Sequence, residues 1–158
     1  MTIRKAAETD IPQMVDLSEK KRVEYETHQP VFWKKAKDSR EKQNLFFQSQ
    51  IKRDNIIALV DEEGGTLKGF LVAALVPAPP VYDPGGLTCV IDDFVVPDRN
   101  EWVEAGKKLL EETQKQARAH GAVQSAVFCG HLDQSKREML SSLGFSIATE
   151  TYVKPFKD

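Results

Sequence analysis

The sequence is poor in cysteine, in long apolar runs and in net charge of either sign. Its two cysteines, Cys89 and Cys129, form neither a disulfide framework nor the paired-cysteine pattern of a zinc site, so no metal is expected. No apolar run approaches the roughly 18 residues of a membrane-spanning helix, and the start of the chain lacks the apolar stretch of a secretion signal. A formal net charge of −2 gives no general attraction to nucleic acid or to anionic membranes. We therefore expect a cytoplasmic protein with no nucleic-acid partner and no membrane partner.

What is present is the composition of one folded domain. Hydrophobic residues make up 41% of the chain and charged residues 29%, which excludes a wholly disordered protein. A length of 158 residues is typical of one domain with its own core, so we expect residues 1–158 to form a single unit. Residues 77–86, dense in proline and glycine, predict a loop because proline neither continues a helix nor donates to a strand ladder.

The order of helical and strand patterns predicts a mixed α/β domain. Apolar spacing predicts three long helices and a fourth, short one opened by a Ser-x-x-Glu capping box: residues 11–26, 32–53, 102–120 and 135–143. Branched and aromatic residues predict seven strands: residues 3–7, 56–61, 67–76, 88–96, 124–129, 145–148 and 151–154. Strands interleaved with helices in this order favour a central sheet covered by helices.

Two short motifs within this order resemble those of the GNAT superfamily of acyl-CoA-dependent N-acyltransferases. Residues 92–96, Asp-Asp-Phe-Val-Val, are similar to the acidic-acidic-aromatic strand ending that leads into the family's CoA-binding turn. Residues 143–145, Leu-Gly-Phe, are similar to the end of the family's last helix. The resemblance spans nearly the whole chain. It implies an α/β (α+β) fold with a mixed central β-sheet of about seven strands, flanked by about four helices.

The resemblance also implies an activity, which is transfer of an acetyl group from acetyl-CoA, the acyl donor, to an amine. The acceptor is unknown and would be a small molecule or a peptide. Since family members often dimerise, a homodimer is a further expectation. The family holds its cofactor with strand and turn backbone groups and has an asparagine near the start of the last helix. The corresponding positions here are Phe94, Val95, Val96, Glu104, Ala105, Gly106, Lys107, Lys108 and Asp133.

Two departures from the family's pattern keep a second function open. Glu104 stands where the CoA-binding turn usually has its middle glycine, and glutamates there would repel a pyrophosphate, although Lys107 and Lys108 offset this charge. Leu140 stands where many members have a tyrosine that protonates the leaving thiolate, and leucine cannot donate a proton. The alternative function is that of a non-catalytic GNAT-like domain that binds CoA, a metabolite or a protein partner.

The strand–helix–strand order predicts where an acyl donor would lie. Residues 88–96 and 124–129 should be parallel neighbours, because the helix between them is a crossover connection. They should splay apart at their C-terminal ends and hold the thioester in the gap. Gly106 has two interpretations, which are close approach of a phosphate to the helix start and close contact between helix and sheet.

The acidic pair supplies the candidates for a general base. Asp92 and Asp93 are adjacent on a predicted strand, so they should point to opposite faces of the sheet. Asp92 is predicted to accept the proton of the amine, from a setting of Val, Ile and Phe that desolvates it. Asp93 is the second carboxylate candidate. His28 is a third candidate catalytic residue, because imidazole exchanges protons near neutral pH.

Aromatic residues gather at the predicted break between the first two helices. The family shapes its acceptor pocket in this region, so the resemblance implies substrate binding there. The candidates are Tyr25, Phe32 and Trp33, together with the nearby His28. Ordinary contact between aromatic side chains beside a helix break is the other interpretation.

Overall fold

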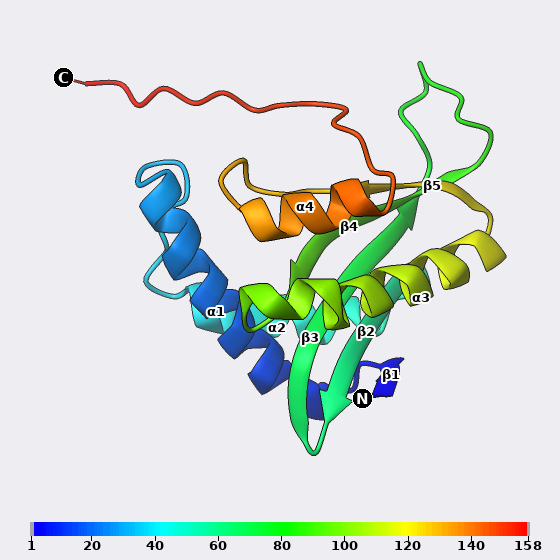
Figure 1. Ribbon diagram of the computed structural model, residues 1–158, viewed down its shortest axis with the longest axis horizontal. Coiled ribbons are helices and arrows are strands. Elements are labelled where there is room, and N and C mark those ends of the chain that lie inside the picture. Colours follow the sequence, from blue (N-terminus) through cyan, green and yellow to red (C-terminus); the bar gives the residue numbers. More distant parts are fainter. Residues whose placement is uncertain (1, 158) are drawn as a thin grey trace.

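Five strands form one sheet in the computed structural model, which describes residues 2–157 (Figure 1). They are β1 (Thr2–Lys5), β2 (Ile56–Glu63), β3 (Thr66–Val76), β4 (Leu87–Val95) and β5 (Ala122–Val127), and they lie side by side in this order. Neighbouring strands are antiparallel, except that β4 and β5 are parallel. The chain joins this parallel pair through a helix, because parallel strands need a crossover connection.

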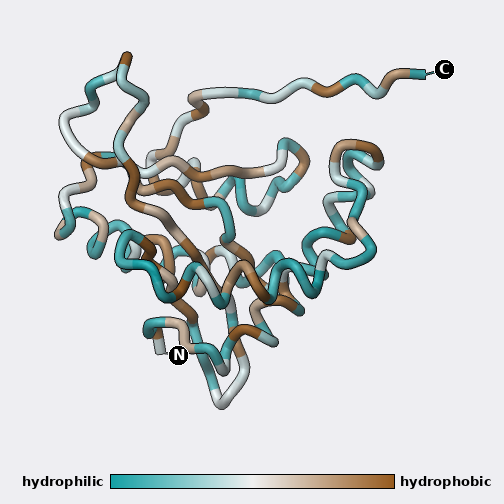
Figure 2. Tube along the Cα trace, turned by 180° about the vertical axis from the view of Figure 1, so that it is seen from behind, coloured by the Kyte–Doolittle hydropathy of each residue, from teal (hydrophilic) through white to brown (hydrophobic). Residues whose placement is uncertain are grey.

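Helices cover both faces of the sheet. They are α1 (Ile11–His28), α2 (Ser39–Gln50), α3 (Ala105–Ala119) and α4 (Gln134–Ser142), with the short 3-10 helices η1 (Glu8–Asp10) and η2 (Arg99–Val103). Strand residues alternate between two hydrophobic clusters, so that Leu59 and Leu71 face α3 and α4 while Val60 and Phe70 face α1 and α2. The strands of the sheet are accordingly hydrophobic along much of their length and lie inside the body (Figure 2). No helix in the described part of the chain is long and apolar enough to cross a membrane.

Three parts of the sequence prediction are wrong. The described residues form five strands rather than about seven, because residues 145–148 and 151–154 follow the last helix without pairing to any strand of the sheet. The second helix begins only at Ser39, and the predicted start, residues 32–38, consists of turns and irregular chain instead. The capping box expected at residues 135–138 is replaced by a helix that starts one residue earlier, with Asp133 as its N-cap residue.

Candidate functional site

β4 and β5 separate near the middle of β4. Their parallel pairing runs from Leu87 opposite Ala122 to Ile91 opposite Val127, and the Phe128 N–H then donates to the Ile91 carbonyl at 3.1 Å. β4 continues to Val95, still paired with β3. The predicted parallel pair that opens toward its C-terminal end is therefore confirmed.

A β-bulge lies where the two strands separate. Val72 on β3 is opposite Asp93, and Ala73 is opposite Ile91, so Asp92 is the extra residue of β4. A bulge bends its strand and increases the local twist, which helps β4 to leave its parallel neighbour. The acidic pair thus sits at the start of the opening.

The gap between the separated strands is bridged by Lys136 of α4. Its Nζ donates to the Phe94 carbonyl of β4 at 3.3 Å and to the Phe128 carbonyl after β5 at 3.1 Å. The same nitrogen lies 5.4 Å from the ring centre of Phe94 and 5.3 Å from that of Trp102. Lys136 is 0% exposed, and this burial, reinforced by nearby Lys21, lowers the pKa of Lys136 to about 7.

Sequence reasoning missed Lys136, although a signal was present. The run Ser-Lys-Arg-Glu suggests a solvated helix start, and long charged side chains are rarely buried. However, Lys136, Met139, Leu140 and Leu143 follow one another at i, i+3, i+4 and i+7, which is the apolar face of the helix. A lysine on that face either extends its side chain until the charged head reaches solvent or, as here, has the charged head buried in the core.

The two adjacent aspartates have different surroundings. Asp92 is exposed, so the expectation that apolar neighbours desolvate it is wrong. Asp93 is half-buried, and burial, followed by the charge of Asp92, raises the pKa of Asp93 above its usual value. Lys21, Arg22 and Lys136 oppose this shift. Asp93 therefore has the environment that was predicted for Asp92.

The predicted aromatic cluster forms in space. The ring centres of Tyr25 and Trp33 are 4.7 Å apart, those of Phe32 and Trp33 are 5.4 Å apart, and those of Tyr25 and His28 are 5.6 Å apart. Nδ1 of His28 is buried and has no hydrogen-bond partner among the described residues. The cluster thus encloses one buried polar atom without a hydrogen-bond partner in the described part of the chain.

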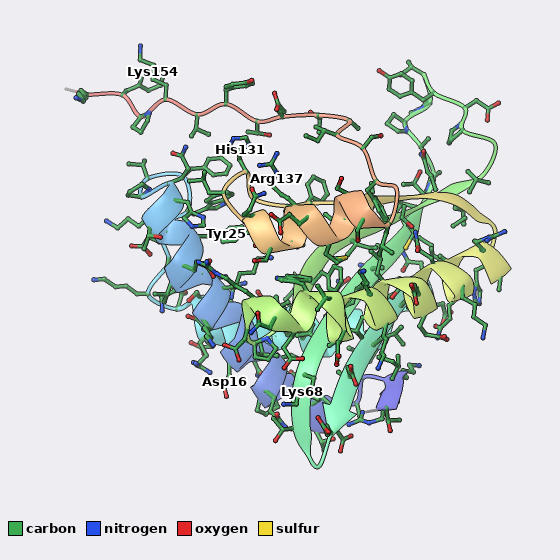
Figure 3. The ribbon with its side chains drawn as sticks, in the orientation of Figure 1. Asp16, Tyr25, Lys68, His131, Arg137 and Lys154 are labelled. Carbon is green, nitrogen blue, oxygen red and sulfur yellow. The ribbon has the colours of Figure 1, made fainter. Side chains whose placement is uncertain are left out.

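Tyr25 links this cluster to the loop that follows β5. Its hydroxyl donates to Oδ2 of Asp133 at 2.6 Å and accepts from the Gly130 N–H at 3.1 Å. Figure 3 shows Tyr25 between α1 and the start of α4. Burial and the Asp133 carboxylate raise the pKa of Tyr25, so the hydroxyl stays protonated. The hydrogen bonds of Asp133 are consequently directed to Tyr25 rather than into the gap.

The predicted cofactor-binding turn lies at the start of α3. Lys108 makes the first backbone bond into the helix, to the Glu104 carbonyl at 3.0 Å, so the three preceding N–H groups are those of a helix N-terminus. Such groups bind anions. Ala105 and Gly106 are buried, whereas Glu104 and Lys108 are exposed. The geometry is compatible with a phosphate, although the glutamate opposes it.

Gly106 is in close contact with Trp102. A Cβ atom added to Gly106 would lie 2.7 Å from Cε3 of the Trp102 ring, and Trp102 is itself buried. This ring also packs edge-on against Phe94, with centres 4.9 Å apart. The structure therefore supports close contact as the reason for this glycine, but the contact is with Trp102 of η2 rather than with the sheet, as the sequence had suggested.

Gly106→Val is expected to destabilise the fold, because the added side chain must displace the buried Trp102. Overpacking of this kind typically costs about 1–3 kcal/mol in the free energy of unfolding. Lys107→Val is the matched control, since it adds the same branched side chain one position along, where the residue is only half-buried. Urea denaturation measures both. Equal losses in the two variants would contradict this account of Gly106.

Comparison with solved structures shows the fold of the GNAT acetyltransferases. A mutant of the BH1408 protein from Bacillus halodurans is similar with a TM-score of 0.86 and 18% identity, over 99% of this chain and 100% of that chain. A predicted acetyltransferase with acetyl-CoA from Clostridium acetobutylicum has a TM-score of 0.74 and 15% identity, over 98% and 95% of the two chains. The aminoglycoside antibiotic 6'-N-acetyltransferase AAC(6')-IG from Acinetobacter haemolyticus has a TM-score of 0.72 and 15% identity, over 100% and 99%.

The family resemblance predicted from residues 92–96 and 143–145 is thus confirmed at the level of the fold. Comparison of the sequence with models of known protein families, and with curated proteins, found no match. The chain is therefore a GNAT-fold protein at low sequence identity to these solved structures.

Proposed function

We propose that the protein transfers an acetyl group from acetyl-CoA to an amine of a small molecule or a peptide. The observation that carries this proposal is the parallel β4–β5 pair, which opens beside an acidic pair and is followed by a loop that Tyr25 of the aromatic cluster binds. The similarity to solved acetyltransferases, one of them with acetyl-CoA, supports it.

The acyl donor would be held by backbone groups along the opening. Residues 94–96, at and just past the end of β4, lie where the strand has lost its parallel neighbour, so we assign the thioester arm to them. The N–H groups of Ala105, Gly106 and Lys107 at the start of α3 would take the pyrophosphate. An N–H near Phe94 would stabilise the oxyanion that forms during acyl transfer.

Asp93 is the general base in this proposal. Its raised pKa brings a carboxylate closer to the range in which it accepts a proton from an ammonium group. Asp92, the base favoured by the sequence, is exposed on the bulge next to it and is the second candidate. His28 is the third, because its buried Nδ1 is free of other hydrogen bonds.

Lys136 is the proton donor in this proposal. Leu140 is in the hydrophobic core and cannot protonate a thiolate, whereas Nζ of Lys136 lies between the carbonyls of Phe94 and Phe128, inside the opening. Asp93 first takes one proton from the acceptor ammonium, which leaves a neutral amine. During transfer the C–N bond forms, the C–S bond breaks, and the thiolate takes a proton from the Lys136 ammonium. The nitrogen then gives its second proton to the neutral Lys136 amine, which restores the ammonium.

A non-catalytic domain that binds CoA, a metabolite or a protein is the second candidate function. The specific observation in its favour is that Lys136 and Trp102 fill the opening, with Nζ close to both aromatic rings. An acyl donor has to displace at least the lysine head. The two functions therefore differ in whether acetyl-CoA enters the opening between β4 and β5, and in whether bound acetyl-CoA then gives its acetyl group to an amine.

Calorimetric titration with acetyl-CoA, followed by a CoA-release assay over a panel of amines, tests both functions. Micromolar binding with amine-dependent CoA release supports the enzyme. Binding without turnover for any amine supports the non-catalytic domain. An absence of binding contradicts the enzyme and the CoA-binding form of the alternative.

Lys107→Glu combined with Lys108→Glu is expected to weaken acetyl-CoA binding by about tenfold or more, because it reverses two charges beside the proposed pyrophosphate site. The loss should be larger at low salt than at high salt, since salt screens exposed charges. Lys115→Glu is the control, because this exposed lysine lies two turns further along α3. If the control weakens binding as much as the double variant, the pyrophosphate does not bind at the helix start.

A further inference from the structure

The inner face of α1 changes from apolar to polar along the helix. Its first half packs into the hydrophobic core on this side of the sheet. Its second half carries polar side chains at the spacing i, i+3, i+4 and i+7, which places them on one face: Ser18, Lys21, Arg22 and Tyr25. Ser18 and Tyr25 are buried, and Lys21 and Arg22 are half-buried. We call Ser18, Lys21 and Arg22 the polar row, and what surrounds these three side chains decides what the row can bind.

The polar row has hydrogen-bonding capacity that the described residues do not use. Ser18 is only 3% exposed, and its Oγ has no hydrogen-bond partner among the described residues. Nη1 of Arg22 is likewise buried without a hydrogen-bond partner, while its other terminal nitrogen donates to Gln43. Lys21 forms no ion pair in the described part of the chain, and its ammonium lies 5.1 Å from the ring centre of Tyr25. Because buried polar groups normally have partners, three such donors on one helix face indicate a ligand site.

The polar row faces the opening between β4 and β5. Asp93 is paired with Val72, which belongs to the hydrophobic cluster under α1 and α2, and directly paired residues share a face of the sheet. The charges of Lys21 and Arg22 accordingly act on Asp93, lowering its pKa against the effect of burial. After burial, the charge of Lys21 is the largest cause that lowers the pKa of Lys136, so the two ammonium groups lie close together. The row therefore adjoins both the proposed base and the proposed proton donor.

The carboxylates beside the row do not balance its charge. Glu19 accepts from a lysine before α2 at 2.9 Å and from the first serine of α2 at 2.6 Å, and its contact with Nη1 of Arg22 is longer, at 3.8 Å. Asp92 is exposed, so solvent screens its charge. Asp93 then faces both cations of the row and the buried lysine of α4. An acceptor that brings only positive charge would add to this excess, whereas one that also carries a negative group would reduce it.

We propose that the acceptor is a zwitterion, in which an amine reaches Asp93 and a carboxylate or phosphate of the same molecule binds the polar row. An ammonium, a guanidinium and a hydroxyl are all donors, and such a set binds anionic oxygens through charge-assisted hydrogen bonds. An amino acid carries both charges in one small molecule. Holding its anionic end would position the amine for attack on the thioester. This inference rests on the proposed acetyl transfer and names the substrate class of that site.

A CoA-release assay with matched pairs of amines tests the charge requirement. Amino acids are compared with their methyl esters, and phosphoethanolamine with ethanolamine, so that the members of each pair differ in the anionic group. We expect kcat/KM to be at least about tenfold higher for the anionic member, in the first pair for a carboxylate site and in the second for a phosphate site. The polycations kanamycin and spermidine should be poor acceptors. Equal or better turnover of the esters, ethanolamine or the polycations overturns this inference and leaves acetyl transfer standing.

Ser18→Ala and Arg22→Met test the polar row itself. Each is expected to raise KM for the anionic acceptor by about tenfold with little change in kcat, because the row holds the anion and not the reacting amine. Arg40→Met is the matched control, since Arg40 is exposed and pairs with Asp16 of α1 at 2.6 Å. Ser18→Ala should also unfold at the same or a higher urea concentration, because it removes a buried hydroxyl without a partner. An unchanged KM in both variants overturns the proposal.

Calorimetry with acetylated products, in the presence of CoA, separates this inference from the proposed activity because it needs no turnover. N-acetyl amino acids are compared with their carboxamides, and N-acetylphosphoethanolamine with N-acetylethanolamine. The wild type should bind the anionic member at least about tenfold more tightly, and Arg22→Met should lose that preference. A preference for the anion without any CoA release contradicts acetyl transfer and supports the anion site. Equal binding of both members, or no binding of either, overturns the anion site.

Discussion

Methionine in place of Lys136 is expected to stabilise the protein and to remove most of its turnover. The folded state lowers the pKa of Lys136 to about 7 from an ordinary 10.5, because the ammonium is fully buried. A methionine of similar length needs no desolvation of a charge. At pH 7 and below, the gain in the free energy of unfolding is up to roughly 5 kcal/mol, set by the size of the pKa shift.

The pH dependence of stability separates this effect from an ordinary change in core contacts. Between about pH 7 and pH 10.5 the unfolded chain still holds the Lys136 proton, which the folded protein has released. The unfolded state therefore binds more protons, so wild-type stability should rise with pH across this window. The methionine variant should lack that rise. Urea denaturation at several pH values measures both curves, and parallel curves would contradict a buried, titrating lysine.

The same substitution should lower kcat by about 10²-fold, the usual contribution of a general acid. The wild-type rate should fall on the alkaline side near pH 7, as Lys136 loses its proton. Besides burial, the charge of Lys21 on α1 lowers the pKa of Lys136, whereas Cys129 and Asp133 in the loop before α4 raise it. Lys21→Met is the control, since it removes a charge that lowers this pKa and should move the alkaline limb to higher pH. Full turnover in Lys136→Met would make the lysine structural.

Asp93→Asn is expected to lower kcat by about 10²-fold or more while leaving acetyl-CoA affinity nearly unchanged. Asparagine keeps the shape of the side chain and cannot accept the proton of the amine. In the proposed function Asp93 acts only when it is ionised, so the wild-type rate should fall as the pH drops through its raised pKa. Steady-state kinetics with the true acceptor, alongside calorimetry, separate the two effects.

Asp92→Asn is the matched control for this substitution. Asp92 is exposed on the bulge, so a loss of less than about tenfold in kcat is expected. Its charge raises the pKa of Asp93, and removing it should shift the acidic limb of the rate profile to lower pH. If Asp92→Asn has the larger loss, the base predicted from the sequence is correct. If neither variant loses turnover, His28 becomes the candidate.

Local sequence patterns predicted the strands and helices that position the site. They did not predict the burial of single residues that depends on contacts with residues far away in the sequence. The run 92–96 and the helix after it were enough to predict a parallel pair that opens, because a crossover connection leaves few alternatives. The bulge that exposes Asp92 depends on pairing with Val72, which lies on another strand. The burial of Lys136 depends on Phe94 and Trp102, which close over its helix from elsewhere in the chain. No window around either residue contains these partners.

The hydroxyl of Tyr25 has a consequence for the order in which the site is assembled. It joins residues 108 positions apart in the chain, through Asp133, and 105 positions apart, through Gly130. Closing so long a loop costs chain entropy before the contact repays it, so contacts of this range form late in folding. The β2–β3 hairpin, by contrast, needs only the short turn at Gly64 and Gly65. We therefore expect a nascent or partly folded chain to have much of its sheet before Tyr25 joins the loop after β5, so that the site is among the last parts of the protein to be assembled.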